Sequence, residues 1–254
     1  MKKALLLLFC SWCGALAAHD TWLETGRGKA ARILQLTSGM AFPVLDYAIK
    51  PERVERAWGR TTAGELLLLK PRRGRHALMF NTPAAPGSFA VQLAPKTLDL
   101  EAGKVAHYFD EIHASEALRQ RWRDTPAPRR WREQYVKHSK TLAARGTDCA
   151  ARFADVLGLG LEIVPEADPC LLAAGGSLPV RVLQAGAAKP GLMLALVASG
   201  GREVAVQGTD AEGRARFTLS ARGRWLLRAT DLRPATVEGL DWQSDFTTYT
   251  FTND

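Results

Sequence analysis

Apart from one run near its start, the sequence has no long apolar segment, and it has few cysteines. Its four cysteines include two within the first twenty residues. No later run approaches the 18 apolar residues of a membrane-spanning helix, so no transmembrane segment is predicted after the start. The motifs GxSxG, HExxH, GxxxxGK[ST] and a GxGxxG after a strand are all absent. The sequence therefore points to no recognised enzyme class.

The composition is that of an ordinary folded protein. Of 254 residues, 46% are hydrophobic and 24% are charged, which leaves room for two domains of about 100–150 residues each. The 34 Lys and Arg exceed the 26 Asp and Glu, giving a formal charge of +8. This balance favours acidic surroundings but does not by itself predict nucleic-acid binding.

Residues 1–18 are predicted to be a secretory signal peptide. Lys2 and Lys3 precede the apolar run ALLLLFCSWCGALAA, which is too short for a membrane anchor and ends in small residues. Cleavage after Ala17 or after Ala18 fits the small-residue rule equally well, and both stay open. The mature protein is expected in the periplasm with His19 first or second.

The remaining cysteines are Cys149 and Cys170, since the other two leave with the signal peptide. Two thiols in an oxidising compartment predict one disulfide, which would contribute about 3 kcal/mol in the chain-entropy model. Neither cysteine has a second ligand at CxxC spacing, so a cysteine metal site is the weaker interpretation.

Most of the chain has the pattern of short β-strands. Apolar runs separated by turn residues predict strands in ARILQL, around Val54 to Trp58, and in ELLLLK, HALMF and SFAVQLA. After Cys170 the pattern resumes in LPVRVLQ, GLMLALVA, REVAVQ, RARFTL, RWLLRAT and DFTTYTFT. A strand every eight to twelve residues is typical of an immunoglobulin-like sandwich.

A helical segment is expected at about 111–146, between the two groups of strands. Ser115 is a plausible N-cap for a first helix. A second helix is expected from near Arg129 to Gly146, because apolar residues recur at helical spacing there. Its buried face would hold Trp131, Tyr135, His138 and Leu142, and Glu133 and Lys137 would form an exposed i,i+4 pair.

These patterns predict a mainly β protein with two β-sandwich domains and a helical insertion. The N-terminal sandwich is assigned to residues 19–165, including the helical segment. Residues 166–254 form the C-terminal sandwich, which is immunoglobulin-like or transthyretin-like.

Four segments together resemble a known family. They are AHDTWLE, WREQYVKHSKTL, LEIVPEADP and TDAEGRARFTLSARGRWLLRA. They are similar to bacterial periplasmic proteins of unknown function that are described as periplasmic components of nickel/cobalt transport. The resemblance implies two sandwiches, transition-metal handling and a metal-transport membrane complex as partner, but no catalytic activity. Cys170 departs from the family pattern, which usually has an aromatic or aliphatic residue after DP.

His19 is the first candidate metal ligand. With His19 at the terminus, its amine and imidazole together chelate a metal ion. With Ala18 first, the amine, an amide nitrogen and the imidazole form a planar site suited to Ni(II) or Cu(II). Asp20 would add an oxygen ligand. The alternative is that cleavage merely falls beside a histidine and that Asp20 begins the first strand.

The stretch HYFDEIH holds the densest group of potential ligands. As a strand it would place His107, Glu111 and His113 on one face, whereas a helix would group His107 with Asp110 and Glu111. The competing interpretation is a junction between a strand and a helix, in which these side chains are only solvated. The sequence favours this interpretation, because the stretch does not contain a complete ligand set.

The other histidines and the arginine-rich segment have simpler explanations. His138 is expected to be a hydrogen-bonded core residue, and His76 to be exposed. The run RQRWRDTPAPRRWR would suggest nucleic-acid stacking in a cytosolic chain. In an exported chain, a solvated helix or contact with anionic lipid or protein is favoured, and no nucleic acid is expected.

The sequence thus predicts a non-catalytic, periplasmic accessory protein that binds nickel, cobalt or copper. His19 would act with His107 or His113 as ligands. Two alternatives stay open. One is a copper-dependent oxidase with an N-terminal histidine brace, and the other is a structural or interaction module without metal.

Overall fold

A computed structural model describes residues 19–26, 33–144 and 152–253 of the chain. The predicted signal peptide and Cys149 lie outside the described residues. Cys170 is buried, and its pairing with Cys149 stays a prediction.

The described strands form three sheets. The five-stranded sheet has the order β1 (Asp20–Thr25), β2 (Ile33–Gly39), β7 (Leu78–Asn81), β6 (Pro71–Arg73), and β3 (Tyr47–Ala48) also pairs with β2. The nine-stranded sheet has the order β15 (Glu203–Gly208), β14 (Met193–Ala198), β17 (Gly223–Pro234), β18 (Trp242–Asn253), β10 (Arg132–Ala143), β8 (Gly87–Leu93), β4 (Val54–Thr61), β5 (Leu66–Leu68), and β9 (Lys96–Asp99) also pairs with β10. The four-stranded sheet holds β11 (Leu161–Pro165), β12 (Ser177–Gln184), β13 (Ala187–Ala188) and β16 (Arg214–Thr218).

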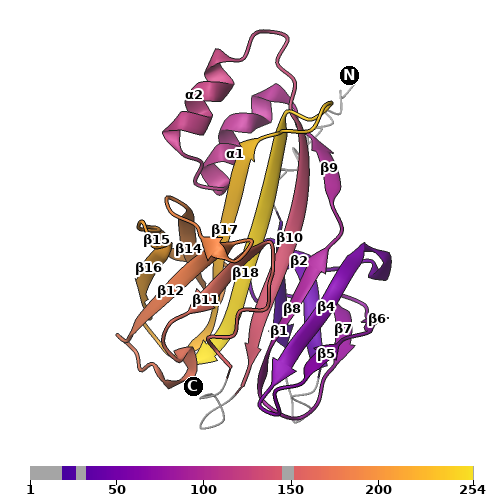
Figure 1. Cartoon of the computed structure of the whole chain (residues 1–254), viewed down its shortest axis with the longest axis vertical. Helices are drawn as coiled ribbons and strands as arrows, with labels where there is room; N and C mark the ends of the chain where they lie inside the picture. The colour runs from indigo at the N-terminus through magenta and orange to yellow at the C-terminus, as the bar shows by residue number, and fades with distance from the viewer. Residues whose placement is uncertain (1–18, 27–32, 145–151, 254) are drawn as a thin grey trace, which may run out of the picture.

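The mainly β fold predicted from the sequence is confirmed, and so is each of the strand runs named above. The large sheet takes strands from both sides of residue 165, and the parallel pair of β10 and β18 joins the two groups. These two long strands run side by side through the middle of the molecule (Figure 1). The division into two domains at residue 165 stays a prediction.

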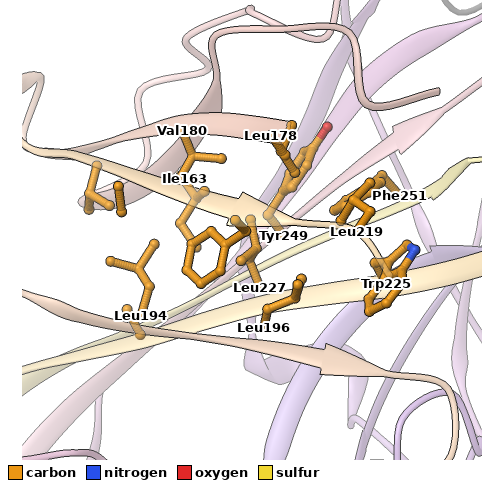
Figure 2. Close-up of a cluster of buried hydrophobic side chains, with 14 of the residues drawn as sticks. Ile163, Leu178, Val180, Leu194, Leu196, Leu219, Trp225, Leu227, Tyr249 and Phe251 are labelled. Carbon is orange, nitrogen blue, oxygen red and sulfur yellow. The ribbon is translucent and has the colours of Figure 1, made fainter. Parts of the chain in front are cut away.

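Two cores lie on opposite faces of the nine-stranded sheet. On one face, β4 and β8 pack against β1, β2 and β7 around Leu36, Phe80 and Phe89. On the other face, β14, β17 and β18 pack against the four-stranded sheet. Figure 2 shows this second core, in which Ile163 and Tyr249 are fully buried. The two sandwiches therefore share one sheet, and each uses a different face of it.

The helices are α1 (Val105–Glu111) and α2 (Glu116–Asp124), with short 3-10 turns η1 (Pro51–Arg53), η2 (Ala102–Lys104) and η4 (Pro169–Leu171). The predicted N-cap is confirmed, since the Ser115 side chain accepts a hydrogen bond from the Leu118 amide. Both helices lie at one end of the long strands (Figure 1). Within the described residues, no helix has the length and apolar character to span a membrane.

The predicted second helix from Arg129 to Gly146 is wrong, because Arg132–Ala143 form the central strand β10. The helix was suggested by the spacing of Trp131, Tyr135, His138 and Leu142. This spacing arose because β10 has buried residues on both of its faces. Glu133 and Lys137 consequently form no exposed helical pair, and Glu133 is fully buried.

An aromatic cluster fixes the helices to the sheet. Trp131 stacks on Trp242 with ring centroids 4.8 Å apart, and aromatic rings of α1 and α2 contact its edges. The Tyr108 hydroxyl and the Trp131 indole donate to the carboxylate of Glu133, at 2.8 and 2.9 Å. These contacts hold the end of α1 at a defined place above the long strands.

Candidate functional site

A polar pocket lies where the first described residues meet the end of α1. Its lining comes from β1, β10, β14, β17 and β18 and from the end of α1. It lies at the start of β1, the edge strand of the five-stranded sheet.

Four of the five predicted metal ligands line this pocket. They are His19, Asp20, Glu111 and His113. They come from two segments about 90 residues apart in the sequence, and folding brings these segments together. The fifth, His107, lies one helical turn before Glu111, with its Nε2 3.2 Å from Glu111 Oε1.

The helical alternative for HYFDEIH is therefore the one observed, and the strand alternative is wrong. His113 follows the helix with a left-handed backbone, φ 51°. This conformation is uncommon for a residue with a side chain.

Three residues of the pocket, His113, Arg228 and Asp20, are linked through Glu203 of β15. His113 Nε2 lies 3.0 Å from Glu203 Oε2, and Arg228 donates to that same oxygen at 3.0 Å. The second guanidinium nitrogen of Arg228 donates to Asp20 at 2.9 Å. These links join the end of α1, β15, β17 and β1 through charge-assisted hydrogen bonds.

Lys137 holds the first described residues against the sheet. Its Nζ donates to the carbonyl oxygen of His19 at 2.6 Å and to the hydroxyl of Thr21 at 3.2 Å. The hydroxyls of Ser139 and Thr248 both donate to the Thr21 carbonyl, at 2.9 and 2.7 Å. Polar side chains of β10 and β18 thus hold the backbone of His19 and Thr21.

Burial and ion pairing shift the pKa values of several groups here. Desolvation raises the pKa of Asp20 despite the opposing charge of Arg228. Desolvation lowers the pKa of Lys137 to about 8, with Asp20 opposing the shift. Burial raises the pKa of Glu203, but hydrogen bonds from His113 and Arg228 outweigh it, and the net pKa is lowered.

Of the remaining histidines, His138 is next to Lys137 and also lines the pocket. It is 2% exposed and its Nε2 lies 2.9 Å from Asp245 Oδ1, so it is the hydrogen-bonded core residue that was predicted, though of a strand rather than a helix. His76 is exposed.

The available donors fit a transition metal only in part. His19, His113 and Met193, whose side chains carry nitrogen and sulfur donors, line one pocket. The carboxylates of Asp20 and Glu203, however, are engaged with Arg228. Among the described residues, no group of three or more His, Cys, Asp or Glu is arranged to hold a metal ion.

Sequence reasoning missed three residues of the site: Lys137, Glu203 and Arg228. Lys137 was assigned to an exposed helical face. The other two lie in segments that were taken only as strands. A charged residue within the apolar run WLLRAT was the available signal for Arg228, since a buried charge requires a partner.

Comparison with known proteins gives a family but no activity. The model of a family described as a domain of unknown function (DUF4198) matches residues 16–231. No curated protein sequence matches the chain. The description of the family names no metal, so the nickel and cobalt role stays a prediction.

Solved structures similar to the chain are distant. One is a segment of two fibronectin type-III domains from chicken tenascin, 11% identical, with 92% of this chain and 99% of that chain covered and a TM-score of 0.24. Another is native alpha-2-macroglobulin from Escherichia coli spanning domains MG0-NIE-MG1, 10% identical, with 92% and 95% covered and a TM-score of 0.23. Such low scores carry no argument about this chain.

Proposed function

The chain belongs to the DUF4198 family, whose description names no function, and we propose from the pocket itself that the protein is a periplasmic accessory protein that binds a transition metal. The metal is nickel, cobalt or copper. In this proposal the protein receives or holds the ion for uptake or homeostasis, with a metal-transport membrane complex as partner.

One observation carries the proposal: His19 and His113 line the same pocket. These imidazoles are distant in sequence, and imidazole is the commonest protein ligand for transition metals. Asp20 and Glu111 line the pocket with them.

Acidic side chains at the pocket could also contact a cation. Asp20 and Glu111 line it opposite Lys137 and Arg228, and Glu203 joins His113 to Arg228 beside it. A bound cation would compete with Arg228 for the carboxylates of Asp20 and Glu203.

Export would complete the ligand set. Cleavage after Ala18 makes the amine of His19 the chain terminus, and the backbone of His19 is already held at the pocket by Lys137. The terminal amine, the His19 imidazole and the His113 imidazole then supply three nitrogen donors. Cleavage after Ala17 instead leaves Ala18 first, and its amine, the His19 amide nitrogen and the His19 imidazole are then the chelating donors.

The donor types also bear on which metal binds. The nitrogen donors suit Ni(II) and Cu(II), whereas the thioether of Met193 is a soft ligand that favours Cu(I). Replacing Met193 with Leu should therefore weaken binding of Cu(I) more than binding of Ni(II).

Calorimetric titration of the processed protein with each metal tests the proposal. We expect one ion per chain, and we expect His113→Ala to weaken binding by at least about tenfold. His76→Ala is the control, because it removes an exposed histidine that does not line the pocket and should leave affinity unchanged. Equal losses in both variants, or no binding by the unaltered protein, would contradict the proposal.

Measuring oxygen consumption with a reductant present separates a carrier from an oxidase. The proposed accessory protein binds copper without sustained oxygen uptake. Turnover that depends on both copper and reductant would instead support the histidine-brace oxidase.

A further inference from the structure

A second surface of the molecule combines exposed leucines with unpaired positive charge. The segment 56–75 contains six Arg or Lys and one Glu, a formal charge of +5 out of +8 for the whole chain. Leu66 and Leu68 in β5 are 51% and 74% exposed. We call this surface the basic edge, defined by β5, β6 and the cations Arg56, Arg60, Lys70, Arg72, Arg73 and Arg75.

The topology places this segment at the edge of both sheets of the N-terminal sandwich. β5 ends the nine-stranded sheet, and β6, which follows it in the chain, ends the five-stranded sheet. Both lie at one side of the molecule, away from α1 and α2 (Figure 1). Exposed edge strands carry unpaired backbone groups, so an apolar edge of this kind is normally protected or used for binding.

The leucines lie on a surface that contains further apolar groups. Leu68 pairs with Trp58 in the register of β4 and β5. The indole of Trp58 donates to the carbonyl of Leu157 at 2.9 Å, which brings the neighbouring Val156, 52% exposed, close to the same surface. Arg56 covers the ring of Trp58, with its guanidinium carbon 4.3 Å from the centroid.

None of the six cations of the basic edge forms an ion pair with any residue that the structure describes. The arginines around α2 differ in this respect. Arg119 pairs with Asp110, Arg123 with Glu116 and Arg130 with Asp241. The arginine-rich segment near α2 is thus largely neutralised within the protein, whereas the charge of the basic edge is available to a partner.

We infer that the basic edge docks on an anionic phospholipid surface. The arginines and Lys70 contact the lipid phosphates, and Leu66 and Leu68 enter the boundary between headgroups and acyl chains. Anionic surfaces attract clustered basic residues, and exposed apolar side chains among them add interfacial burial. β8 and β4 separate β5 from β10, so this surface is distinct from the pocket and does not depend on metal binding.

Vesicle sedimentation of the full processed chain tests the inference. We expect binding to vesicles of phosphatidylcholine mixed with phosphatidylglycerol, weakening with added salt, and no binding to phosphatidylcholine alone. Arg72→Gln/Arg73→Gln/Arg75→Gln should weaken binding by about 100-fold, given about fivefold for each charge near the surface. Leu66→Thr/Leu68→Thr should weaken it by about tenfold, because less apolar area is buried.

The control removes three exposed arginines elsewhere: Arg121→Gln/Arg202→Gln/Arg216→Gln. Its binding should stay within about threefold of the unaltered protein, since these charges lie outside the basic edge. Circular dichroism of each variant checks that the fold is retained.

Equal losses in the control and in the basic-edge variant would overturn the inference, since they would show a response to net charge alone. Equal binding to both kinds of vesicle, or to neither, would also overturn it. Retention on polyglutamate without vesicle binding would identify an acidic protein as the partner instead of a membrane.

Discussion

Lys137 and Lys140 lie three residues apart on β10, yet they face different environments on opposite sides of the sheet. Lys140 is fully buried, and its Nζ donates to Glu162 at 2.7 Å and to the Asp155 carbonyl at 2.6 Å. Lys137 lines the pocket and donates to the backbone of His19. The same residue type on one strand thus stabilises the structure on one face and positions a candidate site on the other.

The difference lies in what surrounds each ammonium group. The carboxylate of Glu162 also accepts hydrogen bonds from the amides of Leu157, Gly158 and Leu159, at 2.8, 2.8 and 3.2 Å. That network is internally satisfied. Lys137 instead holds a chain segment at the edge of a pocket, and desolvation lowers its pKa to about 8. Removing each lysine should therefore have different consequences.

The largest expected effect is on stability, from Lys140→Met. Removing the ammonium leaves the buried charge of Glu162 without its cation, which should cost about 3–5 kcal/mol of unfolding free energy. Urea unfolding followed by tryptophan fluorescence measures the change. Lys140→Met/Glu162→Gln should recover part of the loss, and a single variant as stable as the unaltered protein would show that the pair is not required.

A smaller loss is expected from Gly160→Ala, on the same face as Lys140. A Cβ at this position would lie 3.0 Å from Cε1 of His138, which is itself buried and bonded to Asp245. The imidazole must shift to make room, at a cost of about 1–3 kcal/mol. Gly103→Ala is the control, because a Cβ there has open space around it. Gly158→Ala would not serve, because the φ of 81° at Gly158 is strained for alanine whatever the space.

The acid stability of this face should depend on Asp245. Burial raises its pKa, but hydrogen bonds from His138 and Arg233 outweigh burial, so the net pKa is lowered. A carboxyl with a lowered folded pKa contributes stability above its unfolded pKa of about 4, and this contribution is lost as the pH falls through the folded value. Asp245→Asn should remove that part of the acid sensitivity.

Unfolding free energies of the two proteins, measured at a series of acidic pH values, test this. The unaltered protein should lose stability more steeply than Asp245→Asn as the pH falls below about 5. Parallel curves would mean that Asp245 is not a source of the acid response.

Lys137→Met, the same replacement as at Lys140, is expected to have the smallest effect on stability. Loss of its hydrogen bonds should cost about 1 kcal/mol. Its effect on metal affinity should be larger, about 10-fold to 100-fold, because the carbonyl of His19 loses its anchor. Calorimetry measures the affinity. An unchanged affinity together with a large loss of stability would show that Lys137 stabilises the fold and does not position the site.

Many strands were predictable from sequence because large apolar residues alternate along them. Phe89, Val91 and Leu93 of β8 do so, and β8 was assigned correctly as a strand, although its other face is buried as well, at Ser88 and Ala90. β10 was not predicted as a strand, because several of its buried side chains are polar. His138, Lys140 and Thr141 are buried only because partners distant in sequence satisfy them.

The candidate site was predictable to a similar extent. The imidazoles and carboxylates of His19, Asp20, Glu111 and His113 were found by residue type and clustering. Their partners Glu203 and Arg228 were missed, since only the pairing of β14, β15 and β17 brings those residues to the pocket. A pattern of residues along one chain carries no information about such long-range neighbours.

Native mass spectrometry of the protein isolated from an exporting cell, without an affinity tag, tests the central claim most directly. It determines the first residue of the chain and the mass of any bound ion together. The account predicts a chain that begins at Ala18 or His19 and carries one nickel, cobalt or copper ion, which is lost in His113→Ala. A chain that begins elsewhere, or a correctly processed chain that binds no ion when the metals are supplied, would contradict it.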